Sequence, residues 1–217
     1  MRLDRLVAER GGLSRKDARD AVKRGRVEVD GEPVTDPGRS VPEGGRVTLD
    51  GRVLDVPPEL VAFHKPPGVQ CTVGDPRGRT NLEDVAGDLL AMGLHPVGRL
   101  DADSEGLLLF SRDGALTQRL LHPRHGVRKV YVATVEGTPP DDLGARLAAG
   151  VSTALGEHVA ELLGVEGQEV TLAVQEGKHR MVRRMLANLG LPVVRLLRVR
   201  FGDVELGDLP PGGHRYL

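Results

Sequence analysis

The sequence predicts an α+β protein of two domains. A small N-terminal α/β module covers residues 1–57, and a domain with a mixed, largely antiparallel β-sheet covers residues 59–217. The first 55 residues carry two helix patterns followed by two hairpin patterns, whereas later strand and helix patterns alternate irregularly, without the sustained β-α-β order of a parallel sheet. Paired prolines at 57 and 58 can continue neither a helix nor a strand ladder, so they indicate a linker.

The N-terminal module begins with two short helices. Three apolar residues at helical spacing before a Gly-Gly pair indicate the first helix, and Ser14 begins the second with a capping-box pattern that ends at Asp17. Residues 27–34 and 47–54 then alternate strand-forming residues around an Asp-Gly pair, which is typical of a two-residue hairpin turn. The apolar residues of the two helices are Leu3, Leu6, Val7, Ala18, Ala21 and Val22.

Charge is balanced over the whole chain but basic in two regions. The net charge is −1, yet residues 174–200 hold seven Lys or Arg against one acidic residue, and the first thirty residues hold nine against six. A stripe of basic residues every four positions shares one face of the second helix. Such a stripe is often only solvated, but the excess of one sign and the hairpin behind it favour RNA binding. The candidate RNA-binding residues are Arg15, Arg19, Lys23 and Arg26.

Composition excludes several classes of protein. Cys71 is the single cysteine, so neither an internal disulfide nor a cysteine-based zinc site can form, and we expect no metal. No apolar stretch reaches membrane-spanning length and the charged start lacks a signal core, so we expect a soluble, cytoplasmic protein that does not bind membranes. Three Phe and two Tyr are too few for an exposed base-stacking platform.

The second domain shows strand patterns over residues 60–63, 107–110 and 127–135, and a strand pair over 159–165 and 169–175. Helix patterns cover residues 115–121, the segment after Pro139-Pro140, and residues 178–190. On the last helix five apolar residues share one face, while Arg180, Arg183 and Arg184 fall on the other side. Alternation along 127–135 places Lys129 and Tyr131 on one face.

Asp101 stands in the loop before the buried strand at 107–110. An aspartate there can form a turn, bind a cation or act as a catalytic carboxylate. Asp101, Asp103 and Glu105 resemble the start of a calcium loop, but Arg112 stands where that loop needs a bidentate glutamate. Calcium is therefore disfavoured, and a phosphoryl-transfer DxD site stays open.

Five segments together carry a family resemblance. The stretch from Gly98 to Leu108 resembles the nucleophile motif of the RsuA family of pseudouridine synthases, which modify ribosomal RNA. Four other segments resemble the remaining motifs of that family in order, namely 64–68, 129–131, 176–185 and 195–202. Each is weak alone, but five in order are specific. The first 55 residues likewise resemble the RNA-binding module named after small-subunit ribosomal protein S-four.

The resemblance implies roles for individual residues. Asp101 would be the catalytic carboxylate and Arg183 its ion-pair partner. Tyr131 would remove the proton from carbon 5 of the base, although without the family it reads as a core tyrosine. Leu196 would pack on the uracil ring, and Arg99 would fill the space that the flipped nucleotide leaves.

Four further basic residues are candidates for substrate binding. Lys65 is either a phosphate contact or an exposed lysine on a rigid turn. Arg180 stands where other branches of these enzymes often carry the Gln of a His-Gln pair. The four residues are Lys65, Lys129, Arg180 and Arg184.

The implied reaction isomerises a uridine in ribosomal RNA, 23S rather than 16S, to pseudouridine by a fold of the pseudouridine synthase type. It requires no cofactor, and the sequence cannot decide between attack by Asp101 on sugar or base and a glycal route. We expect a monomer that acts on ribosomal RNA or a ribosome-assembly intermediate. A non-catalytic RNA-binding or ribosome-assembly protein, or a hydrolase using Asp101, is the alternative.

Overall fold

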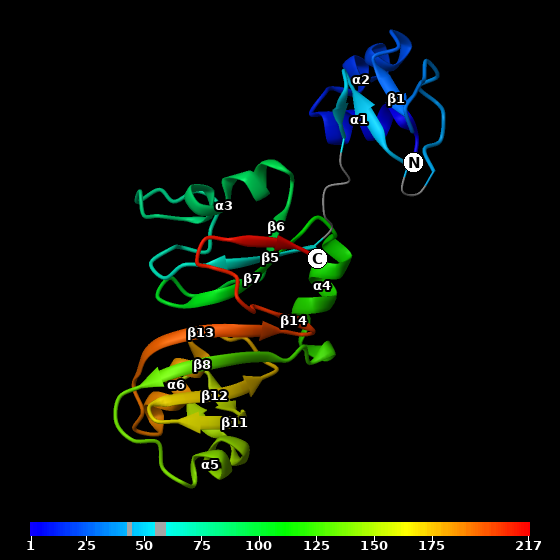
Figure 1. The fold of residues 1–217 in the computed structure, drawn as a ribbon. Helices are drawn as coiled ribbons and strands as arrows, with labels where there is room; N and C mark the ends of the chain where they lie inside the picture. Colours follow the sequence, from blue (N-terminus) through cyan, green and yellow to red (C-terminus); the bar gives the residue numbers. More distant parts are fainter. Residues whose placement is uncertain (43–44, 55–59) are drawn as a thin grey trace. The chain divides into compact units, whose positions relative to one another are not determined.

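The computed structural model describes residues 1–42, 45–54 and 60–217, and it divides the chain into two compact units, Met1–Pro57 and Pro58–Leu217 (Figure 1). The predicted linker at Pro57 and Pro58 lies outside the described residues. The predicted α+β class is confirmed, because helices accompany a mixed sheet in the larger unit.

The first unit consists of two helices and a small sheet. Its elements are α1 (Leu3–Gly11), α2 (Arg15–Lys23), β1 (Val27–Val29), β2 (Glu32–Pro33), β3 (Val47–Leu49) and β4 (Arg52–Val53). The strand order is β2-β1-β3-β4. Both hairpins turn at an Asp-Gly pair with positive φ at each residue, as a type I′ turn requires. The apolar helix residues named above lie buried against the strands, so the predicted pattern of this unit is confirmed.

The start of α2 differs in one bond from a complete capping box. The Ser14 hydroxyl oxygen accepts the Asp17 backbone N–H at 3.1 Å, as predicted. The Asp17 carboxylate accepts from the Ser14 hydroxyl at 2.6 Å. Ser14 therefore caps the helix, and Asp17 holds the capping side chain in place.

The second unit is built on a nine-stranded sheet, counted over the described residues. Its helices are α3 (Leu82–Ala91), α4 (Gly114–Leu121), the 3₁₀ turn η1 (Pro123–His125), α5 (Leu143–Ala149) and α6 (Met181–Asn188). Its strands are β5 (Leu60–Lys65), β6 (His95–Val97), β7 (Glu105–Ser111), β8 (Lys129–Val135), β9 (Val151–Thr153), β10 (Gly156–His158), β11 (Glu161–Glu166), β12 (Glu169–Val174), β13 (Val193–Phe201), β14 (Val204–Glu205) and β15 (His214–Tyr216). Of these, β9 and β10 form a separate pair.

The strand order in the main sheet is β11-β12-β8-β13-β7-β5-β15, with β14 beside β13 and β6 beside β7. All these pairs are antiparallel except β13 with β7, which is parallel and joins the two halves of the sheet through two register pairs. At that joint Gly106 has φ +104, and a Cβ built on it would lie 2.4 Å from the Arg198 carbonyl oxygen. A glycine is therefore required where β7 meets β13.

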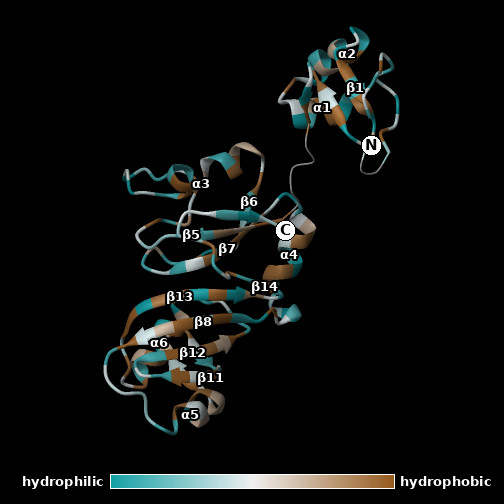
Figure 2. Ribbon diagram, viewed as in Figure 1, coloured by the Kyte–Doolittle hydropathy of each residue, from teal (hydrophilic) through white to brown (hydrophobic). Residues whose placement is uncertain are grey.

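Helices cover the two faces of the sheet unequally. Apolar residues of α3, α5 and α6 belong to one core cluster with Phe63, Leu108 and Leu172. A smaller cluster on the other face contains Leu107 and Leu109, against which α4 packs. Strand β7 is buried along its whole length, and hydrophobic residues follow the central strands (Figure 2). Both faces of β7 are thus covered, which fixes the loop before it.

The structure adds elements that the sequence pattern did not indicate and shifts others. Helix α3 and strand β13 were not predicted as such. The helix expected from residue 178 begins at Met181, because Arg180 adopts a left-handed conformation with φ 52°. That conformation turns the chain sharply just before α6.

Candidate active site

A cavity of about 930 Å³ opens in the second unit beside the loop that carries Asp101. The loop joins β6 to β7, and the Ser104 N–H donates to the Asp101 carbonyl at 3.1 Å to close a turn. The cavity is lined by Gln70, Cys71, Thr72, Gly98, Arg99, Leu100, Asp101, Ala102, Ser104, Leu121, Pro123, Lys129, Tyr131, Val174, Gln175, Glu176, Gly177, Lys178, His179, Arg180, Met181, Val182 and Leu196. Segments from six parts of the unit thus meet at one site.

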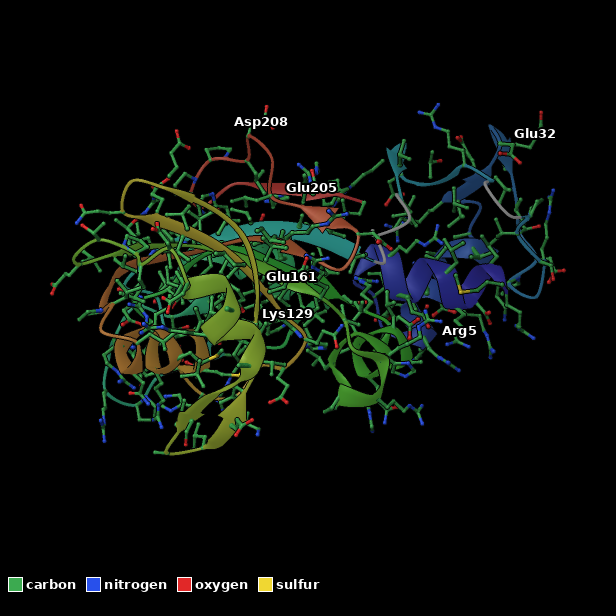
Figure 3. The ribbon with its side chains drawn as sticks, turned by 90° about the horizontal axis from the view of Figure 1, so that it is seen from below. Arg5, Glu32, Lys129, Glu161, Glu205 and Asp208 are labelled. Carbon is green, nitrogen blue, oxygen red and sulfur yellow. The ribbon has the colours of Figure 1, made fainter. Side chains whose placement is uncertain are left out.

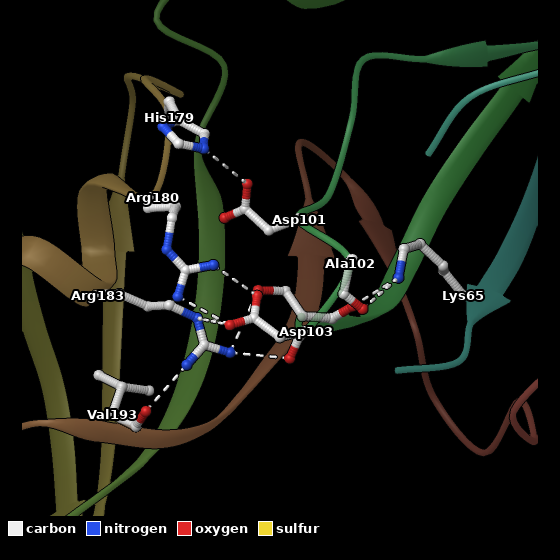
Figure 4. A network of polar contacts seen from close by, with 9 residues as sticks. Lys65, Asp101, Ala102, Asp103, His179, Arg180, Arg183 and Val193 are labelled. Carbon is white, nitrogen blue, oxygen red and sulfur yellow. Dashed lines mark hydrogen bonds and ion pairs between the residues drawn. The ribbon is translucent and has the colours of Figure 1, made fainter. Parts of the chain in front are cut away.

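The Asp101 carboxylate is a quarter exposed and lies at the surface of the cavity. Its oxygen Oδ1 is 4.0 Å from Nε2 of His179, which comes from the turn before α6 (Figure 4). An imidazolium at that distance would form an ion pair with the carboxylate. His179 was not singled out from the sequence, because only the fold brings it to Asp101.

The predicted ion pair between Arg183 and Asp101 is wrong in this structure. The Arg183 guanidinium is buried and donates to the Val193 and Asp103 carbonyls, each at 2.9 Å. Its Nε lies 3.5 Å from the Asp103 carboxylate (Figure 4). Burial lowers the pKa of Arg183. The reason for the difference is the turn at 101–104, which directs Asp103 rather than Asp101 toward α6.

Arg180 forms a bidentate contact in this network. Its guanidinium donates to both oxygens of the Asp103 carboxylate, at 2.9 and 2.8 Å. This hydrogen bonding lowers the pKa of Asp103. Bidentate pairs of this kind fix the relative orientation of both groups. Arg180, the left-handed residue just before α6, therefore links the start of that helix to the loop that carries Asp101.

Lys65 is not at the cavity surface, so both alternatives predicted for it, a phosphate contact and an exposed lysine on a turn, are wrong. The side chain is fully buried at the end of β5. Its Nζ donates to the carbonyls of Pro66 (2.9 Å), Ser104 (2.8 Å) and Ala102 (3.4 Å). Burial lowers the pKa of Lys65 to about 8. Lys65 thus holds the backbone of the Asp101 loop from the side of β5.

Four other candidates line the cavity together with Asp101 and Arg180. Tyr131 of β8 and Leu196 of β13 are buried, and both belong to the main core cluster. Arg99 is exposed at the cavity surface. Lys129 of β8 is buried and is the fourth of these residues (Figure 3).

Lys129 lines the cavity, and its ammonium is bonded to backbone carbonyls of the protein. Its Nζ donates to the carbonyls of Val127 at 3.1 Å and Gln175 at 3.3 Å. It also lies 5.2 Å from the centre of the Phe201 ring. Burial lowers the pKa of Lys129. The backbone therefore orients the Lys129 ammonium before any ligand binds.

The remaining candidates lie elsewhere. Arg184 is half-buried on α6 and is not part of the cavity lining. In the first unit, Arg15 and Lys23 are exposed on α2, and Arg19 lies 3.5 Å from an Asp4 oxygen. Arg26 donates from two nitrogens to the Asp50 carboxylate. Arg26 is thus held within its own unit.

The cavity also contains Cys71, which the sequence identified only as the lone cysteine. Burial raises the pKa of its thiol, and its sulfur lies 3.9 Å from the Gly98 carbonyl oxygen. Asp103 and His179 are likewise additions to the site. Both lie within the recognised motif segments 98–108 and 176–185, which was the signal in the sequence. A place in a motif does not reveal a partner such as that of Asp103, 77 residues away.

Comparison with known proteins identifies the family. The profile of the RNA pseudouridylate synthases matches residues 59–188. The chain belongs to the RNA pseudouridylate synthase family. The predicted resemblance is thereby confirmed, and an S4 domain profile matches residues 1–47.

Relatives of this pseudouridine synthase align over its whole length. A protein of Mycobacterium tuberculosis (strain ATCC 25618 / H37Rv), named an uncharacterized RNA pseudouridine synthase, is 40% identical over 100% of this chain and 89% of its own. The ribosomal large subunit pseudouridine synthase B of Bacillus subtilis (strain 168) is 34% identical over 100% of this chain and 91% of its own. The ribosomal small subunit pseudouridine synthase A of Vibrio parahaemolyticus is 36% identical over 100% and 96%.

A solved structure supports the same assignment. A crystal structure of a pseudouridylate synthase matches 100% of this chain and 96% of its own, with a TM-score of 0.68 and 30% sequence identity. The enzyme is therefore an isomerase of the pseudouridine synthase type. Within residues 1–42, 45–54 and 60–217, no helix is long and apolar enough to cross a membrane.

Proposed function

We propose that this pseudouridine synthase isomerises a uridine of ribosomal RNA and that Asp101 is its catalytic carboxylate. In the reaction the bond from the ribose carbon 1′ to nitrogen 1 of uracil breaks, and a bond from the same carbon to carbon 5 forms. The proton leaves carbon 5, and nitrogen 1 gains one. Atoms and electrons balance without a cofactor or co-substrate.

The observation that carries this proposal is the meeting of Asp101, Tyr131 and Leu196 in one cavity. They come from the loop before β7, from β8 and from β13, so the fold and not the local sequence assembles them. Leu196 gives an apolar surface for the uracil ring, and Asp101 gives an ionisable carboxylate beside it. Tyr131 supplies a hydroxyl that can take the carbon-5 proton once the new bond exists.

The residues around the carboxylate support a positioning function. Lys65 and Arg183 bind the backbone of the Asp101 loop, and Arg180 binds the neighbouring Asp103. A catalytic group held by such bonds needs little reorganisation during the reaction. Arg99, exposed at the cavity, is our candidate for the side chain that occupies the space of the flipped nucleotide.

The first unit is proposed to bind RNA through α2. Arg15, Arg19 and Lys23 are exposed there and can neutralise phosphates. Arg26 is left out of this set because Asp50 already binds its guanidinium. We propose residues 1–57 as the RNA-binding domain and residues 59–217 as the catalytic domain.

The target is tested by mapping pseudouridine chemically in ribosomal RNA from a strain that lacks the gene. We expect one missing modification, in 23S rather than 16S RNA, since we propose that the enzyme acts in the cytoplasm on ribosomal RNA or an assembly intermediate, as a monomer. In the purified enzyme, Asp101→Asn should abolish pseudouridine formation while RNA affinity stays within about twofold. Substantial turnover by that variant would exclude the catalytic role, and an unchanged RNA map would exclude ribosomal RNA as substrate.

A further inference from the structure

One wall of the cavity is formed by α4 and η1, which none of the motifs includes. Leu121 and Pro123 line the cavity. The end of α4 reaches the catalytic loop, because a Cβ on Gly98 would lie only 2.8 Å from the Leu121 side chain. The segment thus borders the cavity next to the residues that lead to Asp101.

The far end of this wall meets the opposite side of the cavity. After η1, Gly126 turns in a left-handed conformation, and a Cβ on it would lie 3.3 Å from the Gln175 side-chain oxygen. Gln175 also lines the cavity and accepts from Lys129 through its carbonyl. The segment from 114 to 126 therefore spans the cavity edge from the catalytic loop to the turn before α6.

The charged side chains of the wall are all basic. Residues 114–125 contain two Arg and two His, and no Asp or Glu. Helix α4 buries none of its residues, and Leu121 is 41% exposed although it is large and apolar. The exposed basic side chains of the wall are Arg119, His122, Arg124 and His125.

Hydrogen bonds within η1 hold Arg124 between His122 and His125, and both imidazoles accept. The Arg124 backbone N–H donates to Nδ1 of His122 at 3.2 Å, and Nε of Arg124 donates to Nε2 of His125 at 3.0 Å. The two imidazole rings lie 6.1 Å apart. Since the bond to His125 uses Nε alone, the terminal nitrogens of Arg124 keep four N–H donors for another acceptor.

We propose that this wall, residues 114–125, binds the phosphate backbone of the RNA next to the nucleotide that enters the cavity. The proposal rests on the proposed function and adds a binding surface to the same site. A uridine flipped out of its stack stays linked through phosphates on both sides, so those phosphates lie at the cavity edge. Guanidinium groups match phosphate geometry, and exposed Leu121 offers an apolar contact for the sugar or base beside them.

The test measures binding of unmodified 16S and 23S ribosomal RNA, transcribed in vitro, to the full-length protein carrying Asp101→Asn, over a series of salt concentrations. In that background Arg119→Gln and Arg124→Gln each remove one wall cation. Arg146→Gln is the matched control, because Arg146 is a half-exposed arginine of α5 paired with Asp142, outside this cavity. Arg124→Lys keeps the charge but loses the bond that Nε makes to His125.

We expect each wall variant to lower the slope of log affinity against log salt by roughly 0.7–0.9 relative to the control, and Arg124→Lys to restore it. In the active enzyme the same changes should raise KM and leave kcat at saturating RNA within about twofold. Equal slopes for Arg124→Gln and Arg146→Gln would overturn the proposal. So would an Arg124→Lys variant as weak as Arg124→Gln, because only the bond to His125 would then matter.

The two proposals fail in different ways. If wild-type protein binds ribosomal RNA with slopes that depend on Arg119 and Arg124 but forms no pseudouridine in it, the wall proposal stands and the proposed substrate is wrong. If pseudouridine forms while the salt slopes of RNA binding do not change in the Arg119 and Arg124 variants, the proposed substrate stands and the wall proposal is wrong.

Discussion

Gly106→Ala should destabilise the second unit by an amount that can be worked out from the joint between β7 and β13. The new Cβ would lie 2.4 Å from the Arg198 carbonyl oxygen and 2.8 Å from its backbone nitrogen, with φ at +104°. Overpacking of this kind costs about 1–3 kcal/mol, and a left-handed backbone for a residue with a Cβ costs about 1–2 kcal/mol. Together we expect a loss of about 2–5 kcal/mol, against a total stability of about 5–15 kcal/mol for a domain.

Calorimetry of the full-length protein is the appropriate assay, because two compact units need not unfold in one transition. The transition of the second unit should move down, while that of the first unit stays in place and serves as an internal reference. Gly87→Ala in α3 is the control, since a Cβ there meets nothing within 4 Å and alanine favours a helix by roughly 0.5–1 kcal/mol. A Gly106→Ala protein as stable as the Gly87→Ala protein would refute the reasoning.

Four further predictions concern charges. Burial lowers the pKa of Lys65 to about 8, so activity should fall above about pH 8 as the neutral amine releases the loop carbonyls. The free energy of unfolding should instead rise between about pH 8 and about 10.5, because in this range only the unfolded chain keeps the lysine protonated. A Lys65→Met enzyme that keeps the alkaline limb of the pH–rate profile would contradict this. Asp103→Asn and Arg180→Gln should lower kcat to a similar degree, and the double variant should lose little more; strictly additive losses would show that the pair does not act as a unit. Because Arg180 lowers the pKa of Asp103, its stabilising effect should be present above the unfolded value near 4 and be lost as the pH falls through the folded one, as acid titration of wild type against Asp103→Asn would reveal. Finally, replacing Arg15, Arg19 and Lys23 of α2 by Gln should flatten the salt dependence of RNA binding and spare the single-turnover rate at saturation. A collapse of that rate would assign the first unit a part in catalysis.

Local patterns were enough to predict most elements of the fold. Periodic apolar residues and Asp-Gly turns gave both helices and both hairpins of the first unit, and the short apolar run at 107–110 gave the centre of β7. The parallel joint of β13 with β7 could not be predicted, because it pairs residues about 90 positions apart and each strand alone carries no mark of its neighbour.

The sequence predicted which motif residues line the site better than it predicted which partners those residues contact. Asp101, Tyr131 and Leu196 line one cavity. The helical wheel, however, placed Arg183 opposite the apolar face of α6 and so predicted an exposed side chain. In the fold its guanidinium is buried against Asp103, 80 residues earlier. Lys65 likewise reads as a surface lysine until the turn at 101–104 supplies two of the carbonyls that bury it. Long-range backbone acceptors leave no trace in the local sequence.

The turn that carries Asp101 has a consequence for how the sequence can vary. Ala102 contributes a carbonyl, which accepts from the Gly68 N–H at 2.7 Å and from Lys65 at 3.4 Å. Every residue offers the same carbonyl, so position 102 can change wherever the cavity admits the new side chain. The residues that hold Asp101, our proposed catalytic carboxylate, therefore lie mostly outside the turn, and they are Lys65, Gly68 and Arg183. Substitutions at those distant positions should displace Asp101 more than substitutions beside it.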